Sequence, residues 1–259
     1  MATALRMQVR PTLEEPVLFL AFEGWNDAGD AASGALRFLD AALCTAPLGE
    51  IDPEEYYDFT VWRPAVRQEP SGGRRIEWPS FRLRYGAVAG RGSLITGLGG
   101  EPHLHWRSFC DEILTVVKEC RVRRALLLGA FMSDVLYSLP VQVTGFSEPP
   151  GTLAGLGVEA THYEGPTGIV GVLAERLAAE RVEVISLWAG LPHYISVTPN
   201  PRGTLALVQA TVRILDLPVD QEPLRRQAAE FEGQVSKLVA EDPALAEYVR
   251  QLKRREFAQ

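Results

Sequence analysis

Cysteine is scarce in this chain of 259 residues, which contains only three of them. Cys44, Cys110 and Cys120 are odd in number, lie far apart and form no C-x-x-C pair, so the sequence indicates no disulfide framework. This pattern is typical of the reducing cytoplasm, where we expect the protein to act. Because 46% of the residues are hydrophobic, a large core can form without disulfides or metals, and no metal site is predicted.

Long hydrophobic runs are also missing. The longest uncharged apolar run, residues 125–132, is far shorter than the roughly 20 residues that cross a bilayer. Residues 1–11 are interrupted by Arg6, Gln8 and Arg10, so they lack the apolar centre of a signal peptide. The sequence therefore predicts a protein that does not interact with membranes.

Basic residues are fewer than acidic ones, which gives a formal net charge of −7 and a pI of about 5.3. Nucleic-acid binding needs a basic surface, so nucleic acid is not an expected partner. Lysine is rare even among the basic residues, since Lys118, Lys237 and Lys253 are the only three and each lies in a predicted amphipathic helix. Schiff-base chemistry requires a buried lysine and is therefore not expected.

No complete catalytic or nucleotide-binding motif is present. Residues 145–149 end in proline where a G-x-S-x-G elbow has its second glycine, and neither a G-x-x-x-x-G-K-[ST] loop nor an H-E-x-x-H pair occurs. The glycines of residues 97–100 resemble a dinucleotide fingerprint, but Pro102 stands in the place of the third glycine. The sequence thus predicts no cofactor and favours a protein that is not an enzyme.

What the sequence does contain is an alternation of apolar strands and amphipathic helices. Buried strands, with helical periodicity between them, are predicted at residues 17–22, 94–98, 124–129 and 182–188. The alternation implies crossover connections and predicts an α/β fold of three layers, α/β/α, with a mostly parallel central sheet. Residues 54–63 and 74–88, rich in aromatic and β-branched side chains, are predicted as further strands at a sheet edge.

The chain is predicted to divide into an α/β domain, residues 1–217, and a C-terminal helical hairpin, residues 218–259. In the hairpin, apolar residues recur at spacings of four and three, as in the seam of a coiled coil. Asp242 and Pro243 supply the cap and first residue of the second helix. Such a hairpin can pack on its own domain or on a neighbouring subunit, and the pattern leaves both alternatives open.

The first candidate site follows the strand at residues 17–22. Glu23, Trp25, Asn26 and Asp27 lie at a glycine corner that opens a helix, which is where α/β proteins often place a site. The carboxylates of Glu23 and Asp27 could serve catalysis or ligand binding. Alternatively, Asn26 or Asp27 caps the helix by accepting hydrogen bonds from its free N–H groups.

Two further strand ends carry carboxylate or imidazole groups. After the strand at residues 94–98, Glu101 and His103 could form an acid–base pair, and His103 could ligate a metal with His105. The alternative is that Glu101 caps a helix beginning at residue 103. After the strand at residues 182–188, His193 and Tyr194 complete the candidate pocket, although a lone histidine there is more often structural.

A separate candidate site for an anion lies at the start of the helix predicted at residues 166–181. Gly165, Thr167 and Gly168 could expose free backbone N–H groups to a negatively charged ligand. The alternative is a tight turn in which Thr167 caps the helix.

Several motifs, taken in order, resemble the proteasome assembly chaperone 2 family, and the alanine- and arginine-rich composition is similar to that of its actinobacterial members. They are Phe22-Glu23-Gly24-Trp25-Asn26-Asp27-Ala28-Gly29, Arg63-Pro64, Gly100-Glu101-Pro102, Tyr163-Glu164-Gly165-Pro166-Thr167-Gly168, Leu187-Trp188-Ala189, Leu191-Pro192-His193-Tyr194 and Pro199-Asn200-Pro201. The resemblance implies a phosphorylase/hydrolase-like fold, self-association into a homo-oligomer such as a trimer, and proteasome subunits as partners. A small-ligand-binding protein or a hydrolase/phosphorylase-like enzyme remains the alternative.

Overall fold

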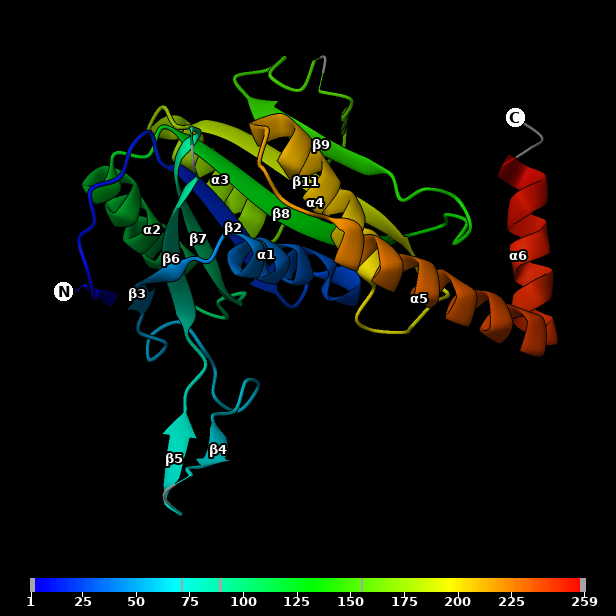
Figure 1. The fold of residues 1–259 in the computed structure, drawn as a ribbon, viewed down its shortest axis with the longest axis horizontal. Helices are drawn as coiled ribbons and strands as arrows, with labels where there is room; N and C mark the ends of the chain where they lie inside the picture. The colour runs from blue at the N-terminus through cyan, green and yellow to red at the C-terminus, as the bar shows by residue number, and fades with distance from the viewer. Residues whose placement is uncertain (1–2, 71, 89, 155, 257–259) are drawn as a thin grey trace.

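A sheet of nine strands forms the centre of the protein in the computed structural model, which describes residues 3–70, 72–88, 90–154 and 156–256 (Figure 1). Across the sheet the strands follow the order β1-β3-β6-β7-β2-β8-β11-β9-β10. Their bounds are Leu5–Met7 (β1), Val17–Glu23 (β2), Ala46–Ile51 (β3), Phe81–Val88 (β6), Gly92–Gly100 (β7), Arg124–Ser133 (β8), Val143–Glu148 (β9), Glu159–Ala160 (β10) and Glu183–Pro192 (β11).

The middle of this sheet is parallel and most of its edge pairings are antiparallel. β2 pairs in parallel with β7 and β8, and β8 pairs in parallel with β11. The pairs β1–β3, β3–β6, β6–β7 and β9–β11 are antiparallel, and the short β10 runs parallel to β9. The predicted α/β fold is confirmed, but the sheet is mixed, so the parallel pairing expected for most of it belongs mainly to its four central strands.

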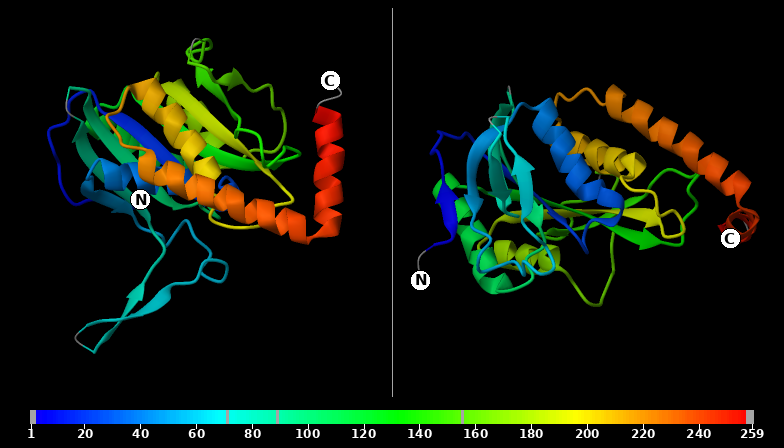
Figure 2. Two further views of the ribbon diagram at one scale, coloured as in Figure 1. Left: turned by 45° about the vertical axis from the view of Figure 1, so that its right-hand side comes forward. Right: turned by 90° about the horizontal axis from the view of Figure 1, so that it is seen from below.

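Helices cover both faces of the sheet, as Figure 2 shows in its right-hand view. On one face lie α1 (Ala31–Ala42), which follows a 3-10 turn at Ala28–Asp30, and α4 (Pro201–Leu215); on the other lie α2 (Trp106–Cys120) and α3 (Ile169–Ala179). Alternate residues of β2 enter the two cores, since Leu18, Leu20 and Phe22 pack on the α2/α3 side and Phe19 and Ala21 on the α1/α4 side. Three layers therefore form as predicted.

Residues 54–63 do not form the predicted edge strand. They make turns that close over the carboxyl end of β7, with Tyr56 and Tyr57 buried. The Tyr57 hydroxyl donates to the Gly100 carbonyl at 2.8 Å, and the Tyr56 ring meets Phe109 of α2 at a centroid distance of 5.3 Å. Packing against the core has thus replaced strand pairing for these aromatic side chains.

A two-stranded arm projects from the body next to these turns (Figures 1 and 2). It consists of β4 (Ala65–Gln68) and β5 (Arg74–Glu77), which pair with each other and with no strand of the main sheet. Val66 and Ile76 face each other across the arm and both are exposed. The strand predicted at residues 74–88 is confirmed in two parts, β5 in the arm and β6 in the main sheet.

The two C-terminal helices, α5 (Glu222–Glu241) and α6 (Pro243–Glu256), extend beyond the sheet, and α6 turns away from the end of α5 (Figure 1). A third apolar cluster joins them to the strand-end loops, and it includes Leu136, Ile195, Phe231, Val235, Val249 and Leu252. The helices therefore contact their own α/β region. The last three residues of the segment 218–259 lie outside the described residues. No helix within the described ranges is both long and apolar enough to cross a membrane.

Candidate functional site

Two loops at the carboxyl ends of central strands and the start of α3 meet at Asn26. The Asn26 side chain is fully buried, and its Nδ2 donates to Oε1 of Glu101 at 2.9 Å. The backbone N–H of Ile169 donates to the same Glu101 oxygen at 2.8 Å, and Gly168 lies directly against both side chains. We call the set Asn26, Glu101, Gly168 and Ile169 the strand-end clasp, because it ties the loops after β2 and β7 to the start of α3.

The start of α3, predicted as an anion site, already holds a carboxylate of the protein itself. Glu101 occupies the first free N–H group of the helix, whereas Thr167 donates from Oγ1 to the Gly168 carbonyl at 3.4 Å. Gly165 adopts a φ of 158° in the turn before it. The expectation that Glu101 caps a helix at residue 103 is therefore wrong, since it caps α3. Binding of an external anion here stays a prediction.

Asp27 caps α1, as one of the sequence alternatives predicted. Its Oδ1 accepts hydrogen bonds from the backbone N–H groups of Ala32 at 2.7 Å and Ser33 at 3.1 Å, whereas its buried Oδ2 has no partner among the described residues. Burial raises the pKa of the Asp27 carboxyl above its ordinary value, and hydrogen bonds from Ser33 and Ala32 partly oppose this. Burial of the charged Asp27 carboxylate thus lowers the stability of the folded state.

Glu23, the other carboxylate of this corner, is linked to the same helix through Arg37. The Arg37 guanidinium forms an ion pair with Glu23 and also donates to Ser33 Oγ at 2.9 Å. Neither Glu23 nor Asp27 is therefore a free carboxylate facing a substrate space. Sequence reasoning missed Arg37 and Ser33; their place one helical turn apart on α1 is the signal that could have revealed them.

We expect Asp27→Asn to raise stability at pH 7 and Asp27→Ala to lower it. Asparagine keeps the accepting oxygen but removes the buried charge, for a gain on the order of 1 kcal/mol; alanine removes the cap, for a loss of about 0.5–2 kcal/mol. Because burial raises the pKa of Asp27, the folded parent chain holds the Asp27 proton more tightly than the unfolded chain does. The parent is therefore destabilised by Asp27 at pH 7 but not in acid, where the carboxyl is neutral. The stability gained by Asp27→Asn should thus vanish as the pH falls toward 4. Urea unfolding at several pH values tests this, and a loss of stability for both variants at pH 7 would contradict it.

The remaining candidate residues lie away from the clasp or on its surface. Trp25 is 63% exposed, and His103 accepts at Nδ1 from the backbone N–H of Asp58 at 3.0 Å. His193 and Tyr194 lie on the side that faces α6, where His193 Nδ1 is 3.0 Å from Asp134 Oδ1. The structure thus divides the predicted pocket into two places. No group of three or more metal-ligating side chains occurs in the part of the chain that the structure describes.

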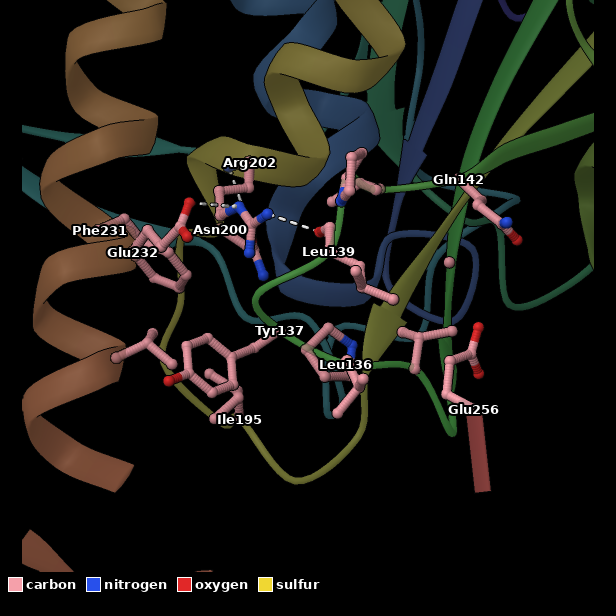
Figure 3. A pocket seen from close by; sticks show the side chains of 16 residues that line it. Leu136, Tyr137, Leu139, Gln142, Ile195, Asn200, Arg202, Phe231, Glu232 and Glu256 are labelled. Atoms are coloured by element: carbon pink, nitrogen blue, oxygen red, sulfur yellow. Dashed lines mark hydrogen bonds and ion pairs between the residues drawn. The ribbon is translucent and has the colours of Figure 1, made fainter. Parts of the chain in front are cut away.

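Tyr194 helps to hold the loop that follows β8. Its hydroxyl accepts from the Tyr137 backbone N–H at 2.9 Å and donates to the Val135 carbonyl at 3.0 Å, and its ring lies 5.3 Å from that of Tyr248 on α6. Beside this loop lies a cavity that contains Arg202 (Figure 3). Sequence reasoning did not single out Arg202, although a cation in the first turn of a helix is an unfavourable placement that could have marked it.

The family model described as the PAC2 family matches residues 21–239. A structure described as a proteasome-assembly chaperone homologue from Mycobacterium tuberculosis is 39% identical, with a TM-score of 0.82, covering 90% of this chain and 99% of its own. A PAC2 family protein from Streptomyces avermitilis is 41% identical, with the same coverage and TM-score.

More distant similarity supports the fold alone. The archaeal proteasome activator PbaB from Pyrococcus furiosus is 18% identical, with a TM-score of 0.72, covering 91% of this chain and 98% of its own. Comparison with curated protein sequences gives no significant match. Because the family match and the two actinobacterial structures extend over most of its length, the chain belongs to the PAC2 family.

Proposed function

We propose that this protein is a homo-oligomeric, non-enzymatic chaperone-like protein that binds proteasome subunits in the cytoplasm. The description of the 39% identical M. tuberculosis relative as a proteasome-assembly chaperone homologue supports the choice of partner. The observation that carries the proposal is the distribution of exposed apolar side chains. Such side chains, when gathered on one side of a protein, mark a surface for another protein.

Of the twelve large apolar side chains that are exposed among the described residues, ten lie at the carboxyl ends of the central strands or in and beside the arm. We call the strand-end group the rim; it consists of Trp25, Leu104, Phe131, Met132, Tyr163 and Val197. The others are Val61, Val66, Ile76 and Trp78. At this edge of the sheet, where α/β enzymes often bind their ligands, the rim presents aromatic and aliphatic side chains.

The alternative, an enzyme or small-ligand-binding protein that uses the predicted pocket, receives less support. Glu23 is paired with Arg37, Asp27 caps α1, and Glu101 caps α3. None of these three carboxylates lines the cavity that contains Arg202. Their contacts are those of groups that hold loops in place.

The test is capture of proteasome subunits by the purified protein, using the parent chain, Trp25→Ser/Met132→Ser and the control Val9→Ser. Val9 is also exposed, but it lies before β2 and away from the rim. We expect the parent and the control to enrich proteasome subunits or their precursors from a crosslinked actinobacterial lysate. The rim variant should recover at least about fivefold less, because central aromatic and aliphatic contacts dominate protein interfaces. Equal recovery with all three proteins, or no proteasome subunit with any of them, would overturn the proposal.

A further inference from the structure

A cavity of about 230 Å³ lies between the strand-end loops and the C-terminal helices (Figure 3). Its walls come from the loop after β8, the end of β11, the start of α4, α5 and the end of α6, and they are mainly apolar. At about 30 Å³ per water molecule, this space holds about eight waters, comparable to the about nine non-hydrogen atoms of leucine. The cavity is therefore of the size that encloses one small metabolite.

Arg202 is the single cation of this cavity among the described residues that line it. Its side chain is only 14% exposed, its Nη2 donates to the Leu139 carbonyl at 2.6 Å, and its Nε lies 3.6 Å from Glu232 Oε2 (Figure 3). A guanidinium has five N–H donors. Most of them thus have no protein acceptor within the described chain, so a buried charge is left with donors available to a ligand.

Besides Glu256 at the end of α6, Glu232 gives the cavity a charge opposite to that of Arg202. It lies on α5, is 43% exposed, and forms an ion pair with the guanidinium at a separation longer than a direct hydrogen bond. A simple carboxylic acid would gain from Arg202 but would be repelled by Glu232. A molecule that carries both a carboxylate and an ammonium group satisfies both side chains and adds no net charge to the cavity.

We propose that this cavity binds a free apolar α-amino acid of about the size of leucine. The α-carboxylate accepts hydrogen bonds from Arg202, and the α-ammonium donates to Glu232. The aliphatic side chain packs against the apolar wall formed by Leu136, Leu139, Ile195, Phe231 and Val235. None of the described residues that line this cavity belongs to the rim or the arm, although Phe131 of the rim lies against Gly190 in its wall. The proposal goes beyond the chaperone-like role and does not depend on it.

Isothermal titration calorimetry with four probes tests each part of the proposal. L-leucine should bind with a Kd below about 1 mM. Glycine lacks the apolar body, 4-methylpentanoate lacks the ammonium and isopentylamine lacks the carboxylate, so each should bind at least about tenfold more weakly. No binding of leucine, or equal binding of leucine and 4-methylpentanoate, would overturn the proposal.

Three variants locate the binding. Arg202→Gln should weaken leucine binding at least about tenfold, and Arg213→Gln, an exposed arginine on the same helix, should leave it unchanged. Leu139→Trp fills the cavity without removing the backbone carbonyl that Arg202 contacts, so it should abolish binding even if Arg202→Gln fails to fold. Undiminished binding by Leu139→Trp, or equal loss in Arg213→Gln, would place the amino acid elsewhere and refute the assignment.

Discussion

Gly168→Ala should lower the free energy of unfolding by about 3 kcal/mol, because a methyl group at this position collides with the strand-end clasp. An added Cβ would lie 2.3 Å from Asn26 Oδ1 and 2.6 Å from Glu101 Oε1. Both side chains would have to move, which breaks the hydrogen bond between them and the one from Ile169 to Glu101. The backbone of Gly168 is extended, with a φ of −90°, so the cost arises from space and not from glycine's conformational freedom.

The control for this prediction is Gly233→Ala in α5. Apart from its chain neighbours and the nearby backbone of α5, no atom of the described chain lies within 4 Å of a Cβ added there, so alanine should stabilise the helix by about 0.5–1 kcal/mol. Urea unfolding at a fixed protein concentration measures both variants. In an Asn26→Ala background, where the amide is absent, Gly168→Ala should cost much less. Additive losses in the double variant would show that the clash with Asn26 is not the cause.

The parts of the fold that sequence predicted are those in which local pattern and tertiary environment agree. β2 and β8 read as unbroken apolar runs because helices cover both of their faces, and both were placed correctly. The edge strand predicted at residues 54–63 was wrong because aromatic side chains occur in strands and in other buried positions alike. Here Tyr56 packs on Phe109 in the core. The antiparallel β6–β7 pair is joined without a helix, so alternation of strands and helices could not reveal it.

Contacts in the candidate site were predictable only where a side chain binds residues close to it in the sequence. Asp27 caps a helix that begins four residues later, and residue type and position indicated this. Glu101 caps a helix whose first residue is 68 positions away, and a single sequence contains no signal for such a contact. His193 likewise follows a strand end, as expected, but it pairs with Asp134 and faces α6, away from the clasp.

Val66→Ser/Ile76→Ser should convert the proposed homo-oligomer into monomers, with a rise of at least about tenfold in the dissociation constant. The two side chains form a cross-strand pair on one face of the arm, and Trp78 is exposed just beyond β5. On the opposite face, Arg67 is bound to Glu77 at 2.8 Å. A two-stranded sheet is at best marginally stable alone in water, so packing of the apolar Val66–Ile76 pair against a second copy would stabilise it.

Charge also favours a second copy of this chain as the partner of the arm. Residues 63–78 contain four arginines and two glutamates, whereas the whole chain has a net charge of −7. A basic arm is therefore attracted to the acidic remainder of another copy, and added salt should weaken the assembly. Analytical ultracentrifugation of the parent, the double variant and the control Leu238→Ser, an exposed residue of α5, measures the effect. Unchanged assembly of the double variant, or a parent chain that is monomeric at micromolar concentration, would show that the arm has another partner.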